Sequence, residues 1–219
     1  MTICETCGRE HSRKVCPYCV RLRLWNAGRG NIALQALFSK RLQSDLLNNY
    51  LSARKVQSMF DQIDGKGLYL CGPTGSGKTV RAAILTMEWA KRRWLDNLTV
   101  EESVRFQPVP NLLQDIKQTF NADSVLTEGG IITSLSEVPW LVLDDLGAEK
   151  TSDWVLQTLY VIINNRYEAQ VPTLFTSNHS LDELASRLGS DRIPSRIAGM
   201  CEIIELDGDD RRIERGNEE

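Results

Sequence analysis

Two kinds of apolar pattern alternate along this chain. Short, mostly apolar runs occupy residues 68–70, 140–143, 172–175 and 201–206, and an alternating segment lies at 104–109. Runs of this length are typical of strands in a parallel sheet that is buried on both faces. Longer segments with apolar residues every three or four positions predict helices at 31–61, 78–94, 112–120, 152–168 and from 181 onward. The chain therefore alternates strands and helices, as an α/β domain does.

Turn and cap residues suggest where these elements begin and end. Two prolines are expected to close the strand at 104–109, and Asn111 is expected to cap the helix that follows. The pair Gly129-Gly130 is expected to break the next helical segment, and Ser152 to cap the helix after it. The polar stretch 164–167 is interpreted as a solvated helix end, with a subunit contact as the alternative.

A glycine-rich turn follows the first buried run and leads directly into a helix. It has the pattern Gly-x-x-x-x-Gly-Lys-Thr at 72–79. Glycines allow the backbone N–H groups to turn inward around a phosphate, at the positive end of the next helix. Lys78 can reach the outer phosphates, and the Thr79 hydroxyl can ligate Mg²⁺. The predicted cofactor-binding residues are Gly72, Pro73, Thr74, Gly75, Ser76, Gly77, Lys78, Thr79 and Val80. The alternative is a Gly-Pro turn that only links a strand to a helix.

Two adjacent aspartates, Asp144 and Asp145, end the apolar run that starts at Trp140. Parallel α/β sheets bind ligands at the carboxyl ends of their strands, and Mg²⁺ on a triphosphate is held by one or two carboxylates. We therefore assign Asp144 to the metal and Asp145 to polarising the attacking water. The alternative is an acidic turn in which Asp145 caps the next helix.

Three polar residues further along are candidates of lower specificity. Asn178 follows the buried run at 172–175, where an amide could orient water or contact a γ-phosphate, or could simply form a turn. Arg192 and Arg196 are four residues apart, so on a helix they could both reach an anion in an adjacent subunit. Such arginines are also common as surface charges.

Four cysteines form two Cys-x-x-Cys pairs near the start of the chain, namely Cys4, Cys7, Cys16 and Cys19. Two such pairs can place four thiolates tetrahedrally around Zn²⁺ in a miniature ribbon, and the metal would supply much of its folding energy. His11 lies between the pairs but is not needed as a ligand. A redox dithiol or a coincidence of spacing is the alternative. The ribbon is expected to dock a protein partner or DNA.

Composition limits the choice of partners. The net charge of −3 excludes a global basic field, so any DNA contact must come from a local patch. Residues 20–30 are basic around Trp25, which suits a linker or a single-stranded nucleic acid contact, and we favour the linker. The sequence shows neither a signal peptide nor a membrane span, so a cytoplasmic protein with reduced thiols is expected.

Together these motifs resemble the AAA+ ATPase module of the DnaC/DnaI-type replicative helicase loaders and the related IstB-type transposition helper ATPases. The resemblance is carried by Gly-Pro-Thr-Gly-Ser-Gly-Lys-Thr (72–79), Leu-Val-Leu-Asp-Asp-Leu-Gly-Ala-Glu (141–149), Pro-Thr-Leu-Phe-Thr-Ser-Asn (172–178) and Arg-Ile-Pro-Ser-Arg-Ile (192–197). It covers roughly residues 50–212 and implies a P-loop three-layer α/β sandwich with a parallel sheet, preceded by a small zinc ribbon and a helical linker.

The resemblance also implies roles for single residues. Lys78 and Thr79 match Walker A, Asp144 and Asp145 match Walker B, and Asn178 matches sensor 1. Arg196 matches a trans-acting arginine finger, with Arg192 as its neighbour or substitute, which implies self-association through the ATP site. Many AAA+ proteins have glutamate where this chain has Asp145, so slow hydrolysis is expected. No helical lid is expected after the last strand, and Arg211 and Arg212 are weak candidates for sensor 2.

The expected domains are a zinc ribbon at 1–20, a linker with helices at 21–60, the ATPase core at 61–212 and a charged tail at 213–219. The expected function is an ATP-dependent helicase loader that uses ATP, Mg²⁺ and Zn²⁺ and delivers a hexameric replicative helicase to single-stranded DNA. A transposition helper ATPase, a nucleotide-gated adaptor with little hydrolysis and a small-molecule kinase are the rivals. The kinase would need an acceptor pocket and a mobile lid, and the sequence indicates neither.

Overall fold

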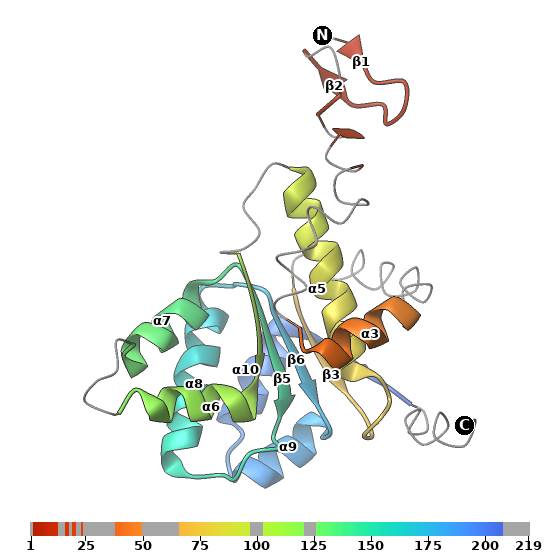
Figure 1. Ribbon diagram of the computed structural model, residues 1–219. Coiled ribbons are helices and arrows are strands. Elements are labelled where there is room, and N and C mark those ends of the chain that lie inside the picture. The colour runs from red at the N-terminus through yellow and green to blue at the C-terminus, as the bar shows by residue number, and fades with distance from the viewer. Residues whose placement is uncertain are drawn as a thin grey trace.

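The computed structural model describes residues 2–12, 16–17, 19–20, 23, 38–49, 66–96, 103–120 and 126–207. Its strands are β1 (Thr2–Ile3), β2 (Glu10–His11), β3 (Gly67–Cys71), β4 (Val104–Pro108), β5 (Trp140–Leu146), β6 (Thr173–Ser177) and β7 (Cys201–Glu205). Its helices are α3 (Lys40–Asn49), α5 (Lys78–Leu95), α6 (Val109–Gln118), α7 (Glu128–Glu137), α8 (Asp153–Glu168), α9 (Leu181–Leu188) and α10 (Arg192–Met200). Figure 1 shows their arrangement.

The main sheet has the strand order β4-β5-β6-β3-β7, and every neighbouring pair is parallel. The predicted parallel sheet is therefore confirmed. β6 lies between β3, which leads into the glycine-rich turn, and β5, which carries the aspartate pair. Because the strands are parallel, their carboxyl ends meet at one edge, and this edge brings the two sequence motifs together.

Helices cover both faces of this sheet (Figure 1). Alternate residues of each strand point to opposite faces, so Tyr69 packs with α6–α10 while Leu68 packs with α3 and α5. The same division holds in β5, where Leu141 belongs to the first core and Val142 to the second. The result is the predicted three-layer α/β sandwich.

Arg166 of α8 is completely buried, which contradicts the predicted solvated helix end for this residue, whereas Asn165 and Tyr167 of the same stretch are exposed. Its guanidinium donates hydrogen bonds to the hydroxyl of Thr173 and to the carbonyls of Leu135, Ser136, Val138 and Pro172. These carbonyls include ones at the end of α7, which lack partners within the helix. Burial lowers the pKa of Arg166 to about 10, so the side chain stays charged at neutral pH.

Two other boundary predictions are wrong. α6 begins at Val109, with Pro108 as its N-cap and Pro110 in its first turn, so Asn111 is not the cap. A proline is tolerated there because the first helical N–H groups need no partner inside the helix. Gly129 and Gly130 do not break a helix, because both lie in the first turn of α7 after the Thr127 cap. The predicted cap at Ser152 is confirmed by its hydrogen bond from the Val155 N–H.

Several predictions fall on residues outside the described ranges. They include most of the basic segment 20–30, the whole region 50–61, the candidates Arg211 and Arg212, and the tail 213–219. The domain borders stay predictions, although Phe38, Leu42 and Leu46 pack into the same core cluster as β3. Among the helices that the structure describes, none has the length and apolar character needed to cross a membrane.

Candidate functional site

The glycine-rich turn starts where β3 ends and runs directly into α5. Gly72, Gly75 and Gly77 have φ values of 140°, 84° and 87°, which residues other than glycine rarely adopt. A Cβ on Gly72 would lie 2.2 Å from the Leu206 carbonyl oxygen, so the turn also needs glycine for its close approach to the chain after β7. The prediction that the turn needs glycines for their backbone conformation is thus confirmed.

Lys78 folds back over the turn. Its ammonium donates to the carbonyl oxygens of Gly72 and Pro73 at 2.8 Å and 2.7 Å, and the residue is buried. The cation therefore lies at the centre of the loop that the sequence assigns to phosphate. A positive charge held there, next to the N-terminus of α5, favours an anion inside the turn.

Asp144 joins the turn to the carboxyl edge of the sheet. Its Oδ1 accepts hydrogen bonds from the Thr79 hydroxyl at 2.9 Å and from the Thr176 hydroxyl at 2.6 Å. Burial raises the pKa of Asp144, while the two hydroxyl donors and the nearby Lys78 oppose that rise. Thr176 was not predicted as a site residue, although its place in the last part of a buried strand next to β5 is a usable signal.

Asp145 lies in an irregularity of the sheet that the sequence did not indicate. The register of β5 against β6 shifts between Leu143 and Leu146, and Asp145 has a φ of 62°. Its N–H donates to the Thr176 hydroxyl, and its Oδ1 accepts from the amide of Asn178 at 3.2 Å. A β-bulge re-aims side chains beside functional sites. Here it allows the carboxylate of Asp144 to face Thr79 while Asp145 faces Asn178.

Glu149, the last residue of the motif 141–149, is a further buried carboxyl that the sequence analysis gave no role. Its Oε2 accepts from the Gly147 N–H at 3.1 Å, while its Oε1 is buried without a hydrogen-bond partner among the described residues. Burial raises the pKa of Glu149, and the negative charge of Asp145 adds to the rise. The side chain fixes the turn that follows the aspartate pair.

The two candidate arginines lie on α10 and have different surroundings. Arg192 is exposed, and its backbone N–H donates to the Ser190 hydroxyl. Arg196 is half-buried against α8, where its Nε donates to the Asn164 Oδ1 at 2.7 Å. Within the described chain, no hydrogen bond or ion pair connects either arginine to residues 72–79 or to the aspartate pair. Within one chain, the two arginines and the nucleotide motifs are therefore separate groups.

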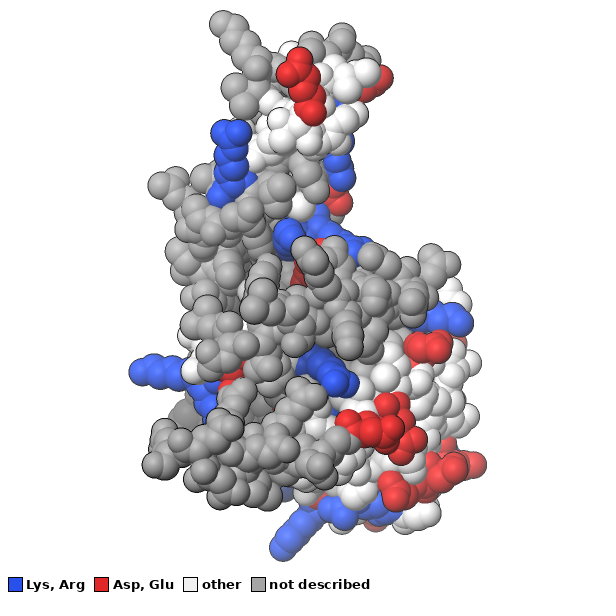
Figure 2. Space-filling model, turned by 90° about the vertical axis from the view of Figure 1, so that its right-hand side faces the viewer, with Lys and Arg blue, Asp and Glu red and all other residues white. Residues whose placement is uncertain are grey.

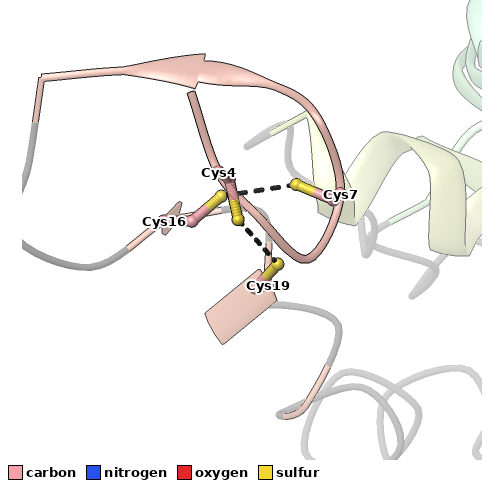
Figure 3. Close-up of side chains that lie close together, drawn as sticks. All are labelled: Cys4, Cys7, Cys16 and Cys19. Carbon is pink, nitrogen blue, oxygen red and sulfur yellow. Dashed lines mark hydrogen bonds between the residues drawn. The ribbon is translucent and has the colours of Figure 1, made fainter. Parts of the chain in front are cut away.

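The four cysteines of the N-terminal module converge (Figure 3). Their sulfur atoms all lie within 4.8 Å of one another, with 3.7 Å between Cys4 and Cys19 and 3.6 Å between Cys7 and Cys16. A tetrahedral zinc site with Zn–S bonds of about 2.3 Å requires sulfur separations of about 3.8 Å. All four thiols are free of disulfides, so the donor set fits Zn²⁺. Backbone N–H groups of Cys7 and Thr6 lower the pKa of Cys4 to about 6.

On the face shown in Figure 2, the described residues do not form a broad basic patch. Over the described part of the face in Figure 2, Lys and Arg side chains are interspersed with Asp and Glu. This mixture agrees with the net charge of −3. Any nucleic acid contact on this face would be local.

Comparison with known proteins gives consistent matches. A family model described as IstB-like ATP binding protein matches residues 44–218. The replicative helicase loader DnaI of Bacillus subtilis (strain 168) is 31% identical, over 68% of this chain and 48% of its own length. The replicative helicase loader DnaC of Escherichia coli (strain K12) is 26% identical, over 65% of this chain and 55% of its own length.

Solved structures agree with these matches. A crystal structure of DnaI superposes with a TM-score of 0.53 at 33% identity, covering 67% of this chain and 73% of that chain. The chain spans about half the length of the curated relatives that it matches. The range matched by the family model, residues 44–218, includes the turn, the aspartate pair and the two arginines.

Proposed function

Since the chain belongs to the IstB-like ATP-binding protein family, we propose that it binds ATP with Mg²⁺ between the turn at 72–79 and the aspartate pair, and that it hydrolyses the nucleotide slowly. The observation that carries this proposal is the 2.9 Å hydrogen bond from Thr79 to Asp144, which joins motifs 65 residues apart in the sequence. A hydroxyl and a carboxylate at this separation are oxygen donors of the kind that Mg²⁺ prefers. The residues present thus fit the metal–nucleotide pair.

Each residue of the site has a distinct task. Lys78 would exchange its bonds to the Gly72 and Pro73 carbonyls for the outer phosphates, because a triphosphate offers it stronger charge-assisted hydrogen bonds. When bound, Mg²⁺ neutralises charge on the β- and γ-phosphate oxygens. Asp144, which already accepts from Thr79, would hold the metal together with that hydroxyl.

Asp145 and Asn178 would act on the attacking water. The amide of Asn178 donates to Asp145 and fixes the direction of the carboxylate, which can then accept a proton from the water. Aspartate is one methylene shorter than the glutamate of many AAA+ proteins, so the water is held less closely. This difference supports slow hydrolysis.

A pair of variants tests nucleotide binding and hydrolysis separately. Lys78→Ala is expected to abolish ATP binding in isothermal titration, and Asp145→Asn to retain binding but lower single-turnover hydrolysis roughly 100-fold. Lys150→Ala, on the exposed loop before α8, is the control. If Lys78→Ala binds ATP as tightly as the unchanged chain, the proposed site is wrong.

We further propose that Cys4, Cys7, Cys16 and Cys19 hold a structural Zn²⁺. The support is the sulfur geometry, which is close to that of a tetrahedral thiolate site. Four thiolates would close the coordination sphere, so the metal would fold the module and not take part in hydrolysis. Metal analysis of the purified chain should give one zinc per chain.

For the whole chain, we propose a cytoplasmic helicase loader that delivers a hexameric replicative helicase to single-stranded DNA and self-associates through the ATP site. The support is the similarity to the loaders DnaI and DnaC over about two thirds of this chain. The zinc module would contact the helicase. Native mass spectrometry of the chain with a replicative helicase, ATP and single-stranded DNA is expected to show a ternary complex, and its absence with zinc-loaded protein would contradict this partner.

A transposition helper ATPase is the second candidate, and the family model itself favours it. In the same experiment, a transposase and double-stranded target DNA would replace the helicase and the single strand. A nucleotide-gated adaptor is distinguished by phosphate release: ATP-dependent complex formation without single-turnover hydrolysis would identify it. The short side chain of Asp145 is the observation that keeps this candidate open.

A further inference from the structure

Arg196 is held by three residues of α8. Its Nε donates to Asn164 at 2.7 Å, and its guanidinium carbon lies 5.2 Å from the ring centre of Tyr160 and 5.7 Å from that of Tyr167. These residues are spaced by four and then three positions, so they lie on one face of the helix. We call Tyr160, Asn164 and Tyr167 the arginine cradle.

The cradle occupies the Nε–H of Arg196 and leaves its two Nη groups available. The Nε–H is occupied, but within the described chain neither Nη group donates a hydrogen bond and no carboxylate lies at ion-pair distance from Arg196. The two Nη groups of a guanidinium form a planar fork that matches two oxygens of a phosphate. The fork therefore lacks the acceptor for which its geometry is suited.

A glycine makes the cradle possible. A Cβ on Gly199 of α10 would lie 2.9 Å from the ring of Tyr167, so the ring can lie against α10 only where no side chain intervenes. Arg192, one turn earlier on α10, provides the contrast, because it is exposed and its side chain contacts no ring and no acceptor among the described residues. The cradle thus selects Arg196 from the two candidates.

We propose that Tyr160, Asn164 and Tyr167 are positioning residues that preorganise Arg196 to bind a phosphate of ATP held by a second copy of this chain. The inference rests on the proposed function, because it requires ATP at a site shared between copies. Fixing a long side chain before association removes part of the ordering cost of binding. Loss of the cradle should therefore weaken the contribution of Arg196 without altering the ATP site of the same chain.

Mixed assemblies test the proposal. A Lys78→Ala chain binds no nucleotide but supplies an intact Arg196, and an Arg196→Ala chain supplies the nucleotide site. Mixing the two is expected to restore single-turnover phosphate release that neither has alone. Adding Asn164→Ala to the Lys78→Ala chain should reduce the restored rate roughly threefold to tenfold. Gln157→Ala, exposed on α8, is the matched control and should not change it.

Two further measurements separate positioning from simple helix packing. At dilutions that keep the chain monomeric, Asn164→Ala should leave the ATP dissociation constant unchanged. In the assembled chain, its combination with Arg196→Ala should cause no loss of hydrolysis beyond that of Arg196→Ala alone. Nuclear magnetic resonance of ¹⁵N-arginine-labelled chain should show a slowly exchanging Arg196 Nε–H that exchanges quickly in Asn164→Ala.

The possible failures are distinguishable. If Arg196→Ala hydrolyses ATP and self-associates in sedimentation as the unchanged chain does, the proposed role of Arg196 at a shared site is wrong. Two other results would contradict only the positioning role of the cradle. In the first, Arg196→Ala is impaired but the Lys78→Ala chain that also carries Asn164→Ala restores activity fully in the mixture. In the second, the Arg196 Nε–H exchanges equally fast in the unchanged chain and in Asn164→Ala.

Discussion

The nucleotide site and the cysteine cluster are held in place in different ways. The nucleotide site lies at the edge of a sheet whose strand residues, such as Tyr69, Leu143 and Phe175, are completely buried. The cysteine cluster is supported by β1 and β2, which are two residues long each, and Cys16 is its only buried member. The comparison indicates that packing builds the first site before any ligand binds, whereas the second would depend on the zinc that we propose for it.

Zinc removal should have the largest effect and should be confined to one region. Structural zinc contributes on the order of 10 kcal/mol to the folding of small modules, so Cys16→Ser or chelation should unfold residues 2–20. Amide signals of this module should collapse in nuclear magnetic resonance spectra, while the ATP dissociation constant changes less than about twofold, because the ATP site is built by the packed sheet. A parallel loss of ATP binding would show that the two regions are not independent.

Removal of the buried arginine should destabilise the sheet-based region instead. Arg166→Ala leaves several buried carbonyl oxygens without a donor and opens a cavity. The free energy of unfolding should therefore fall by about 3–5 kcal/mol. Urea denaturation followed by tryptophan fluorescence measures this change. Lys150→Ala, which is exposed, should differ from the unchanged chain by less than about 0.5 kcal/mol.

The buried carboxylate of Asp144 is expected to lower the stability of the folded chain, although hydrolysis requires it. Its pKa is raised by burial in the folded chain, so the folded state binds the proton more tightly than the unfolded state. Stability without nucleotide should then fall as pH rises from the unfolded pKa to the folded one. Asp144→Asn should reduce this dependence and raise stability at pH 7 by about 1 kcal/mol, while hydrolysis is lost.

Thermal melting without nucleotide between pH 4 and 8 measures that dependence. Asp115→Asn, on the exposed side of α6, is the matched control and should follow the unchanged chain. A less stable Asp144→Asn chain at pH 7 would show that the carboxylate is not a source of strain.

A helix cap should give the smallest effect. Ser180 and Glu183 form a reciprocal capping box at the start of α9, just after Asn178. Ser180→Ala should lower the free energy of unfolding by about 1 kcal/mol in urea denaturation, because a helix N–H loses its acceptor. Ser186→Ala, within the same helix, should be close to neutral. Equal losses in both variants would contradict the capping explanation.

The parts of the molecule that are governed by local chemistry could be predicted from the sequence. The turn at 72–79, the cysteine pairs and the cap at Ser152 each depend on residues close together in the chain. The bulge at Asp145 could not be predicted, because it depends on the register between β5 and a strand about 30 residues later. Arg166 was misjudged for the same reason: a cation near a helix end resembles a solvated one until its distant acceptors are known.

The order of strands in the sheet also has a consequence for biosynthesis. β3 leaves the ribosome early, yet its two neighbours are β6 and β7, which begin at Thr173 and Cys201. Parallel pairings between such distant segments form slowly, because a long loop must close first. A nascent chain therefore cannot assemble the strand that leads into the phosphate turn until most of the polypeptide has been translated, and chaperones would meet it with that strand still unpaired.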